Sequence, residues 1–253
     1  MLKLIFCEFQ KLKRKKFIQI TICAAALFPI PITILMARDS QTFDQLFRAC
    51  VIFGDFLFLP CVLGVIAAML FFMERDNDTL KNLLVIPISR TKIVLSKLCV
   101  LLGLSVLYSV TSLGASLIGG VIVGQVDNIL LRLEISICLG FFIMIAALPV
   151  VSLILFSSKN YIFAVILSFA YAVIGFAVTM MFSSDPETFN SIASVLPVPL
   201  IMKWYLGAVP VEAELSYLVP YTISLPFITG IMILYGSVFL LLSVSLYKRS
   251  TIM

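Results

Sequence analysis

The sequence predicts an all-α integral membrane protein with about six transmembrane helices. Of its 253 residues, 62% are hydrophobic and only 12% are charged, whereas soluble domains are roughly half apolar and a quarter charged. The apolar residues fall into runs of about 20, the length of a helix that crosses a hydrocarbon core of roughly 30 Å. These runs lack the two-residue alternation of a membrane β-barrel, so we expect helices.

The first element is an amphipathic helix over residues 1–16. Its apolar residues share one face, and six lysine and arginine residues lie on the others, as in helices that rest in the membrane interface. The apolar face comprises Leu2, Ile5, Phe6, Phe9 and Leu12.

Six spans follow in order, and we treat residues 1–253 as one transmembrane domain. We expect a kink in the first span at Pro29 and Pro31, which membrane helices tolerate. Before the last span, the outer segment 183–220 is too polar at its ends to cross the membrane, and Pro197 and Pro199 indicate a re-entrant or surface-lying pair of short helices. The spans are expected at residues 17–36, 49–72, 98–123, 132–156, 162–182 and 221–247, joined by a polar loop at 37–48, a central polar stretch at 73–97, a turn at 124–131 and a tight loop at 157–161.

The distribution of basic residues predicts the orientation. All but four of the 18 lysine and arginine residues fall on the side shared by the N-terminus, the 73–97 stretch and the C-terminus. Loops rich in basic residues stay in the cytoplasm, so both termini are expected there. The same pattern explains the net charge of +5 without a nucleic-acid partner. The four exceptions are Arg38, Arg48, Arg132 and Lys203.

The chain lacks the residues of several common active sites. It has no histidine and no G-x-x-x-x-G-K-[ST] phosphate loop, and its six cysteines show no metal-ligand or disulfide spacing. We therefore expect no catalytic residue, no metal site and no cofactor bound by the chain itself. An intramembrane enzyme is disfavoured because no acid, base or metal site is evident.

Within the central stretch, residues 74–86 are expected to form a short amphipathic helix. Leu80, Leu83 and Leu84 share one face of that helix. Pro87 must end it, because proline cannot continue a helix.

A second helix is expected immediately afterwards. Ser89 can cap a helix that starts near Arg90 and runs into the third span. The result is a stiff, charged knob continuous with two transmembrane helices, which could transmit force in a way that a flexible linker could not. The alternative is an ordinary solvated loop whose charge only fixes topology.

The central stretch carries the pattern Glu74, Asp78-Thr79-Leu80, Leu83-Leu84, Pro87-Ile88-Ser89-Arg90, Ile93 and Ser96-Lys97. This pattern resembles the loop between the second and third helices of type-2 ABC transporter permeases. The resemblance implies that the segment is a coupling helix that docks on a separate ATPase. One departure is Asp78, where the family commonly has glycine. By this resemblance the expected coupling residues are Glu74, Asp78, Leu80, Leu83, Leu84, Pro87, Ser89 and Arg90.

The length and the N-terminal sequence narrow the resemblance. The opening Glu8-Phe9-x-Lys11-Leu12-x-Arg14-Lys15-Lys16 looks most like the lantibiotic-protection and bacitracin-resistance branch. The resemblance implies a multi-pass permease in a bacterial cell membrane, paired with a second identical or paralogous permease and with ATPase subunits that bind ATP and Mg. The cargo would be an antimicrobial peptide or a lipid-like molecule. A secondary transporter and a non-transporting sensor or anchor subunit remain alternatives.

Two features inside the spans are candidate sites. Asp55 is an acidic residue within the second span, where a charge is costly, so it is a candidate for the transport path. Snorkelling or simple protonation would explain it equally well. In the third span, Ser112, Ser116, Gly120 and Gly124 recur every four residues. Such a stripe lets another helix approach closely, within one subunit or across a dimer.

Aromatic and methionine side chains gather in the outer segment. Anchoring at the lipid headgroups is the expected role, because such residues are enriched at membrane interfaces. Contact with an amphipathic peptide is the alternative. The residues are Met202, Trp204, Tyr205 and Tyr217.

Overall fold

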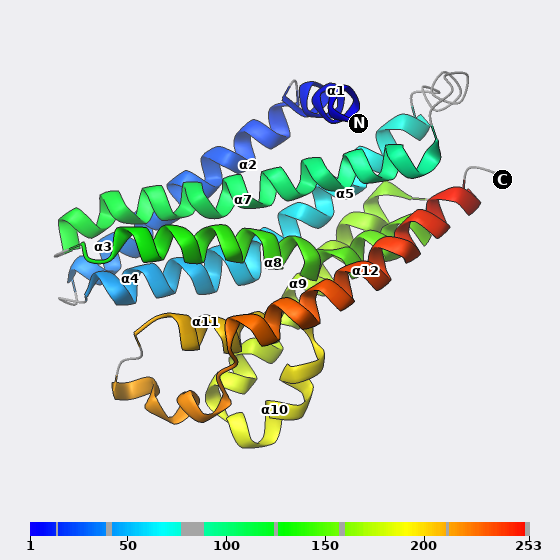
Figure 1. Cartoon of the computed structure of the whole chain (residues 1–253). Coiled ribbons are helices and arrows are strands. Elements are labelled where there is room, and N and C mark those ends of the chain that lie inside the picture. The colour runs from blue at the N-terminus through cyan, green and yellow to red at the C-terminus, as the bar shows by residue number, and fades with distance from the viewer. Residues whose placement is uncertain are drawn as a thin grey trace.

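The chain folds into a bundle of long helices, as predicted (Figure 1). The computed structural model describes residues 1–13, 15–38, 42–76, 89–123, 126–156, 160–210 and 213–250. Within these residues, six helices are long and apolar enough to cross a membrane, or seven if one bent pair is counted as a span. The elements are α1 (Leu2–Lys13), α2 (Lys16–Leu27), α3 (Pro29–Arg38), α4 (Phe43–Cys50), the π-helix η1 (Val51–Phe58), α5 (Leu59–Asp76), α7 (Arg90–Val123), α8 (Ile129–Phe156), α9 (Tyr161–Ser184), α10 (Pro186–Val195), α11 (Pro197–Ala208), the 3-10 helix η2 (Ala213–Tyr221) and α12 (Leu225–Ser250).

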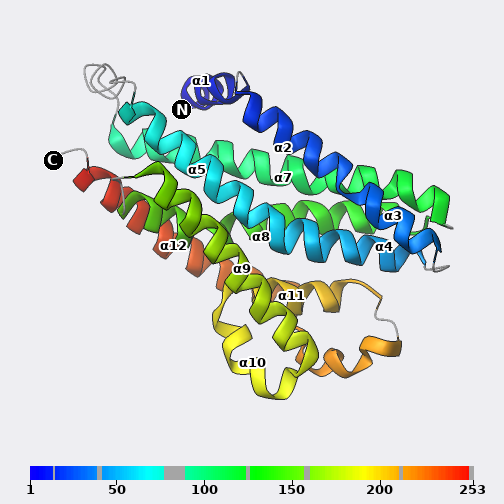
Figure 2. The same cartoon turned by 180° about the vertical axis from the view of Figure 1, so that it is seen from behind.

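The first span is broken where the prolines predicted a kink. Helix α2 ends at Leu27, and α3 begins at Pro29. Proline fits the first position of a helix because that position has no intrahelical partner for an N–H group. Helix α1 precedes this span and packs against α7 near the end of the bundle where α12 also ends (Figures 1 and 2).

The second span begins earlier than predicted. We expected a polar loop over residues 37–48, but α4 already starts at Phe43. Thr42 and Gln45 form a capping box, in which the Thr42 side chain accepts from the Gln45 N–H and the Gln45 side chain accepts from the Thr42 N–H. This local signal was present in the sequence and favours a helix start at this point.

The helix predicted to start near Arg90 and to run into the third span is confirmed, since α7 starts at Arg90. Helix α5 continues to Asp76, four residues beyond the predicted end of the second span at residue 72. The 34 residues of α7 are roughly 50 Å long at 1.5 Å per residue, which exceeds the hydrocarbon core. Helix α7 is therefore long enough to extend beyond the hydrocarbon core of the membrane.

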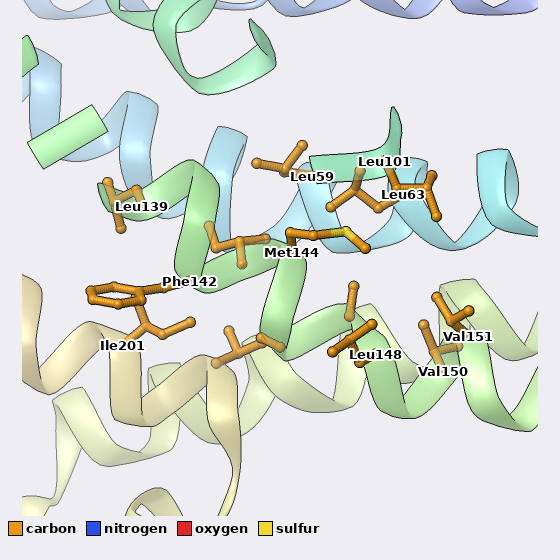
Figure 3. Packing of buried hydrophobic residues seen from close by; sticks show 14 of the residues in the cluster. Leu59, Leu63, Leu101, Leu139, Phe142, Met144, Leu148, Val150, Val151 and Ile201 are labelled. Carbon is orange, nitrogen blue, oxygen red and sulfur yellow. The ribbon is translucent and has the colours of Figure 1, made fainter. Parts of the chain in front are cut away.

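The core lies where α5, α7, α8 and α11 meet, and Figure 3 shows their side chains converging. Helix α8 is central, since 72% of its most apolar 18-residue window is buried, against 11% for the first span. The first span and the α9 and α12 spans thus present mostly apolar surface outward, which suits lipid contact.

The outer segment forms the expected pair of short helices. Helices α10 and α11 are bent by 116° relative to each other, and α11 packs against α8 and α9 (Figure 2). The last span, α12, starts four residues later than predicted, because residues 213–221 form η2 instead.

Candidate functional site

Only part of the predicted coupling segment lies within the described residues. Asp78, Leu80, Leu83, Leu84 and Pro87 lie outside them. Glu74 belongs to α5 by its backbone.

Two residues of the predicted coupling segment are described at the start of α7. The Ser89 carbonyl accepts hydrogen bonds from the N–H groups of Lys92 and Ile93, which begin the first turn. Arg90 Nη1 donates to the Lys248 carbonyl at 3.1 Å, so the start of α7 is tied to the end of α12.

Lys97 joins the two helices that flank the central stretch. Its side chain is fully buried, and its Nζ donates to the Leu70 carbonyl of α5 and lies 4.8 Å from the centre of the Phe71 ring. The helix predicted to start near Arg90 includes Lys97, and the structure adds that this side chain is buried. The helix turns Lys97 toward α5, and the neighbouring Ile93 and Val94 are buried too.

Aromatic pairs brace the same end of α5 against two further helices. Phe71 packs against Tyr247 of α12, with ring centres 5.9 Å apart. Phe72 meets Tyr161 of α9 edge-on at 6.1 Å. Helices α9 and α12 therefore hold the ends of α5 and α7 together. We call this group of contacts the cross-braced base, and it is defined by Arg90, Lys97, Phe71 and Phe72.

Asp55 lies in the π-helix η1 and is 4% exposed. Ser109 of α7 donates to its carboxylate at 3.3 Å. The carboxylate borders a cavity of about 430 Å³ between α2, α5 and α7. Of the sequence-predicted residues, Ser112 lines the same cavity.

The small residues of α7 admit neighbouring helices of the same chain. A methyl group on Gly120 would collide with the Phe43 ring of α4. Ser116 is buried, and its hydroxyl donates to the Leu113 carbonyl 2.8 Å away. Gly124 lies outside the described residues. At Gly120, at least, the close approach is made within one subunit.

At the other end of the bundle, Arg132 forms a cluster that the sequence did not indicate. It is 4% exposed, forms an ion pair with Asp44 of α4, and stacks over Phe43 and Phe47 at 4.3 and 5.0 Å from the ring centres. Its Nε donates to the Asp127 carbonyl at 2.9 Å. The pairing of Asp44 with Arg132 could not be predicted from the sequence, because 88 positions separate the two residues.

Lys203 fixes the bend between α10 and α11. Its Nζ donates to the Asn190 side chain and to the Ser194 hydroxyl, each at 2.6 Å, and lies 5.0 Å from the Phe182 ring centre. Burial lowers the pKa of the Lys203 ammonium below its ordinary value. This bent pair is thus a rigid element and not a loose outer loop.

The aromatic residues of the outer segment are mostly buried, which contradicts the expected anchoring at headgroups. Trp204 and Tyr205 are 4% and 1% exposed, and Met202 is also buried. Trp204 packs edge-on against Phe142 of α8 at 5.1 Å. Tyr217 alone of the four is exposed. The 116° bend turns α11 inward, and the sequence pattern did not reveal it.

Within the part of the chain that the structure describes, six long apolar helices, a cross-braced base at one end and a bent pair of short helices define a multi-pass α-helical membrane protein. Among the described residues, no group of three or more His, Cys, Asp or Glu side chains could hold a metal ion.

The family model for ABC-2 family transporter proteins matches residues 4–175, more than half of the chain. The chain therefore belongs to this family and is a permease-type membrane component, a class that is generally not itself catalytic and associates with ABC ATPase subunits. No curated protein matches the chain.

Proposed function

We propose that the chain is the permease subunit of an ATP-driven exporter whose ATPase subunits dock on residues 73–97 from the cytoplasm. Two permease subunits, identical or paralogous, would form the path between them, and closure of the ATP-bound ATPases would rock the helices. ATP and Mg would bind in the ATPases. The cargo would be an antimicrobial peptide of the lantibiotic or bacitracin kind, or a lipid-like molecule.

The cross-braced base is the observation that carries this proposal. Residues 77–88 are flanked by α5 and α7, and Lys97 bonds these two helices to each other through the Leu70 carbonyl. Arg90 and Phe71 connect the same pair to α12. A push delivered between α5 and α7 would move a rigid unit, because packed interfaces shift as bodies and do not deform continuously.

The distribution of charge supports a cytoplasmic position for this base. The N-terminal helix α1 and the end of α12, which carries Lys248 and Arg249, lie at the same end of the bundle (Figure 1). Basic residues favour the cytoplasmic side of a membrane. An ATPase that uses cellular ATP would meet the base there.

The docking test uses a double variant and a matched control. Leu83→Glu combined with Leu84→Glu puts charge on the predicted apolar face, whereas Asn82→Glu adds charge on the opposite face of the same predicted helix. The full-length chain is tagged and purified from its native membranes, and the co-purifying ATPase is identified by mass spectrometry. ATP hydrolysis by the complex is then measured in proteoliposomes.

We expect the double variant to insert into the membrane normally but to lose the ATPase and at least tenfold of the ATP hydrolysis, while Asn82→Glu keeps both. Retention of the ATPase by the double variant would refute docking at this segment. Cargo export without ATP would favour a secondary transporter, and a complex without export would favour a sensor or anchor subunit.

A further inference from the structure

The cavity beside Asp55 has the features of a binding site within the membrane-spanning bundle. Its volume of about 430 Å³ falls within the range of small-molecule sites. Its walls come from α2, η1, α5 and α7, and most of its lining residues are apolar. Thr21, Tyr108, Ser112 and Asp55 supply the polar groups.

Among the described residues that line the cavity, Asp55 carries the one carboxyl group. Asp55 is buried, and the Ser109 hydroxyl at 3.3 Å is a long hydrogen bond for an O–H donor. None of the described residues that line the cavity is basic. A buried carboxylate is stable when ionised only if a positive charge pairs with it, so the site is complementary to a cation.

Two phenylalanine rings also line the cavity. Phe28 and Phe58 meet edge-on with ring centres 5.1 Å apart, and both line the cavity. The Tyr108 hydroxyl donates to the Thr21 hydroxyl and so joins α7 to α2 across the cavity. Aromatic faces attract cations and also accept apolar groups, so these rings suit a cation that carries apolar substituents.

The backbone at Asp55 is specialised. Residues 51–58 form a π-helix, a rare form that appears mostly as single-turn bulges inside α-helices and is frequent at functional sites. Gly54 lines the cavity next to Asp55, and an added methyl group would make ordinary van der Waals contact with the Ser112 hydroxyl at 3.5 Å and the Phe28 ring at 3.7 Å. Ser112 and Phe28 therefore lie close to the backbone beside Asp55.

The first span forms the outer wall of the cavity. Its side chains are mostly unburied, and the main partner of α2 within the bundle is α7. A ligand dissolved in the lipid would meet this thin wall first, since lipid surrounds the exposed face of α2.

We propose that this cavity binds a lipophilic cation, with its charge paired to Asp55 and its apolar body against Phe28 and Phe58. As a cargo site, this rests on the exporter proposed above. Binding is measured on the purified full-length chain alone, without an ATPase. A failure of the binding proposal can therefore be distinguished from a failure of the export proposal.

Tetraphenylphosphonium is the probe, and tetraphenylborate is its control of nearly equal shape and opposite charge. Saturable binding of radiolabelled probe is measured on the chain in nanodiscs of zwitterionic lipid, after subtraction of empty nanodiscs. Asp55→Asn keeps the shape of the side chain and removes its charge. Glu134→Gln removes an exposed carboxylate of α8 that lies outside the cavity. Val62→Phe fills the cavity from α5.

We expect tetraphenylphosphonium to bind to the unaltered chain and to Glu134→Gln with equal affinity, and at least tenfold more weakly to Asp55→Asn and to Val62→Phe. Equal binding to Asp55→Asn would overturn the proposal. Equal competition by tetraphenylborate would also overturn it, because the cavity would then be an apolar lipid site. Unchanged binding to Val62→Phe would place the cation elsewhere and would likewise contradict the assignment.

Discussion

Lys97 of α7 donates a hydrogen bond to the backbone carbonyl of Leu70 in α5, so a fully buried ammonium joins the two helices that flank residues 77–88. The same ammonium lies over the Phe71 ring, which in turn packs on Tyr247. One side chain thus connects α7, α5 and, through an aromatic pair, α12.

Replacing Lys97 tests this connection. Lys97→Met keeps the apolar stem but removes the charged donor, and a hydrogen bond from a charged group is worth about 1.5–3 kcal/mol. We expect a lower midpoint of thermal unfolding in detergent and weaker stimulation of ATP hydrolysis. Lys92→Met is the control, because Lys92 lies in the same part of α7 and is exposed. Identical behaviour of the two variants would show that the buried ammonium does not brace the base.

The ion pair between Arg132 and Asp44 predicts that removing Asp44 alone destabilises the protein more than removing both partners. Asp44→Ala leaves a buried guanidinium without its counter-charge, and we expect the free energy of unfolding to fall by about 2 kcal/mol. Adding Arg132→Met should recover part of that loss, because the unpaired charge is then gone. Denaturation in mixed micelles measures both values. Additive losses in the double variant would mean that the pair does not stabilise the bundle.

Two glycines of α7 provide a test of helix packing and its control. Gly120→Ala would push a methyl group into the Phe43 ring, whereas Gly114→Ala would meet nothing within 4 Å. We expect Gly120→Ala to lower the thermal unfolding midpoint by several degrees. Gly114→Ala should leave it unchanged or raise it, since alanine favours a helix by up to about 1 kcal/mol over glycine. Equal midpoints would contradict close packing of α4 on α7.

Orientation is tested by cysteine labelling in right-side-out vesicles. In a background where the native cysteines Cys7, Cys23, Cys99 and Cys138 are replaced, a membrane-impermeant maleimide should label Ser191→Cys from outside. Ser191 is exposed on α10 and belongs to the outer segment. Asn82→Cys should react only after permeabilisation. The opposite pattern would invert the topology and remove the basis for cytoplasmic docking.

The long helices were predictable because their signal is local. A run of about 20 apolar residues can satisfy its backbone in lipid only as a helix, and the proline pair at Pro29 and Pro31 marked the break between α2 and α3 correctly. An error arose where polar residues were equated with a loop. Residues 43–48 are helical in spite of their charges, because a capping box starts the helix and Asp44 pairs with Arg132.

The candidate sites were harder to predict. Asp55 stood out by sequence because a carboxylate is rare inside a span, but its cavity required knowledge of how α2, α5 and α7 pack. The burial of Lys97 and Arg132 was not predicted, because their partners Leu70 and Asp44 lie far from them in the sequence.

By itself, the sequence determined that the protein crosses a membrane about six times as helices, since length and hydrophobicity act residue by residue along one segment. Only the tertiary structure decided which charges are buried and what they meet. That outcome depends on how each helix is rotated against its neighbours, and contacts between positions far apart in the chain set this rotation.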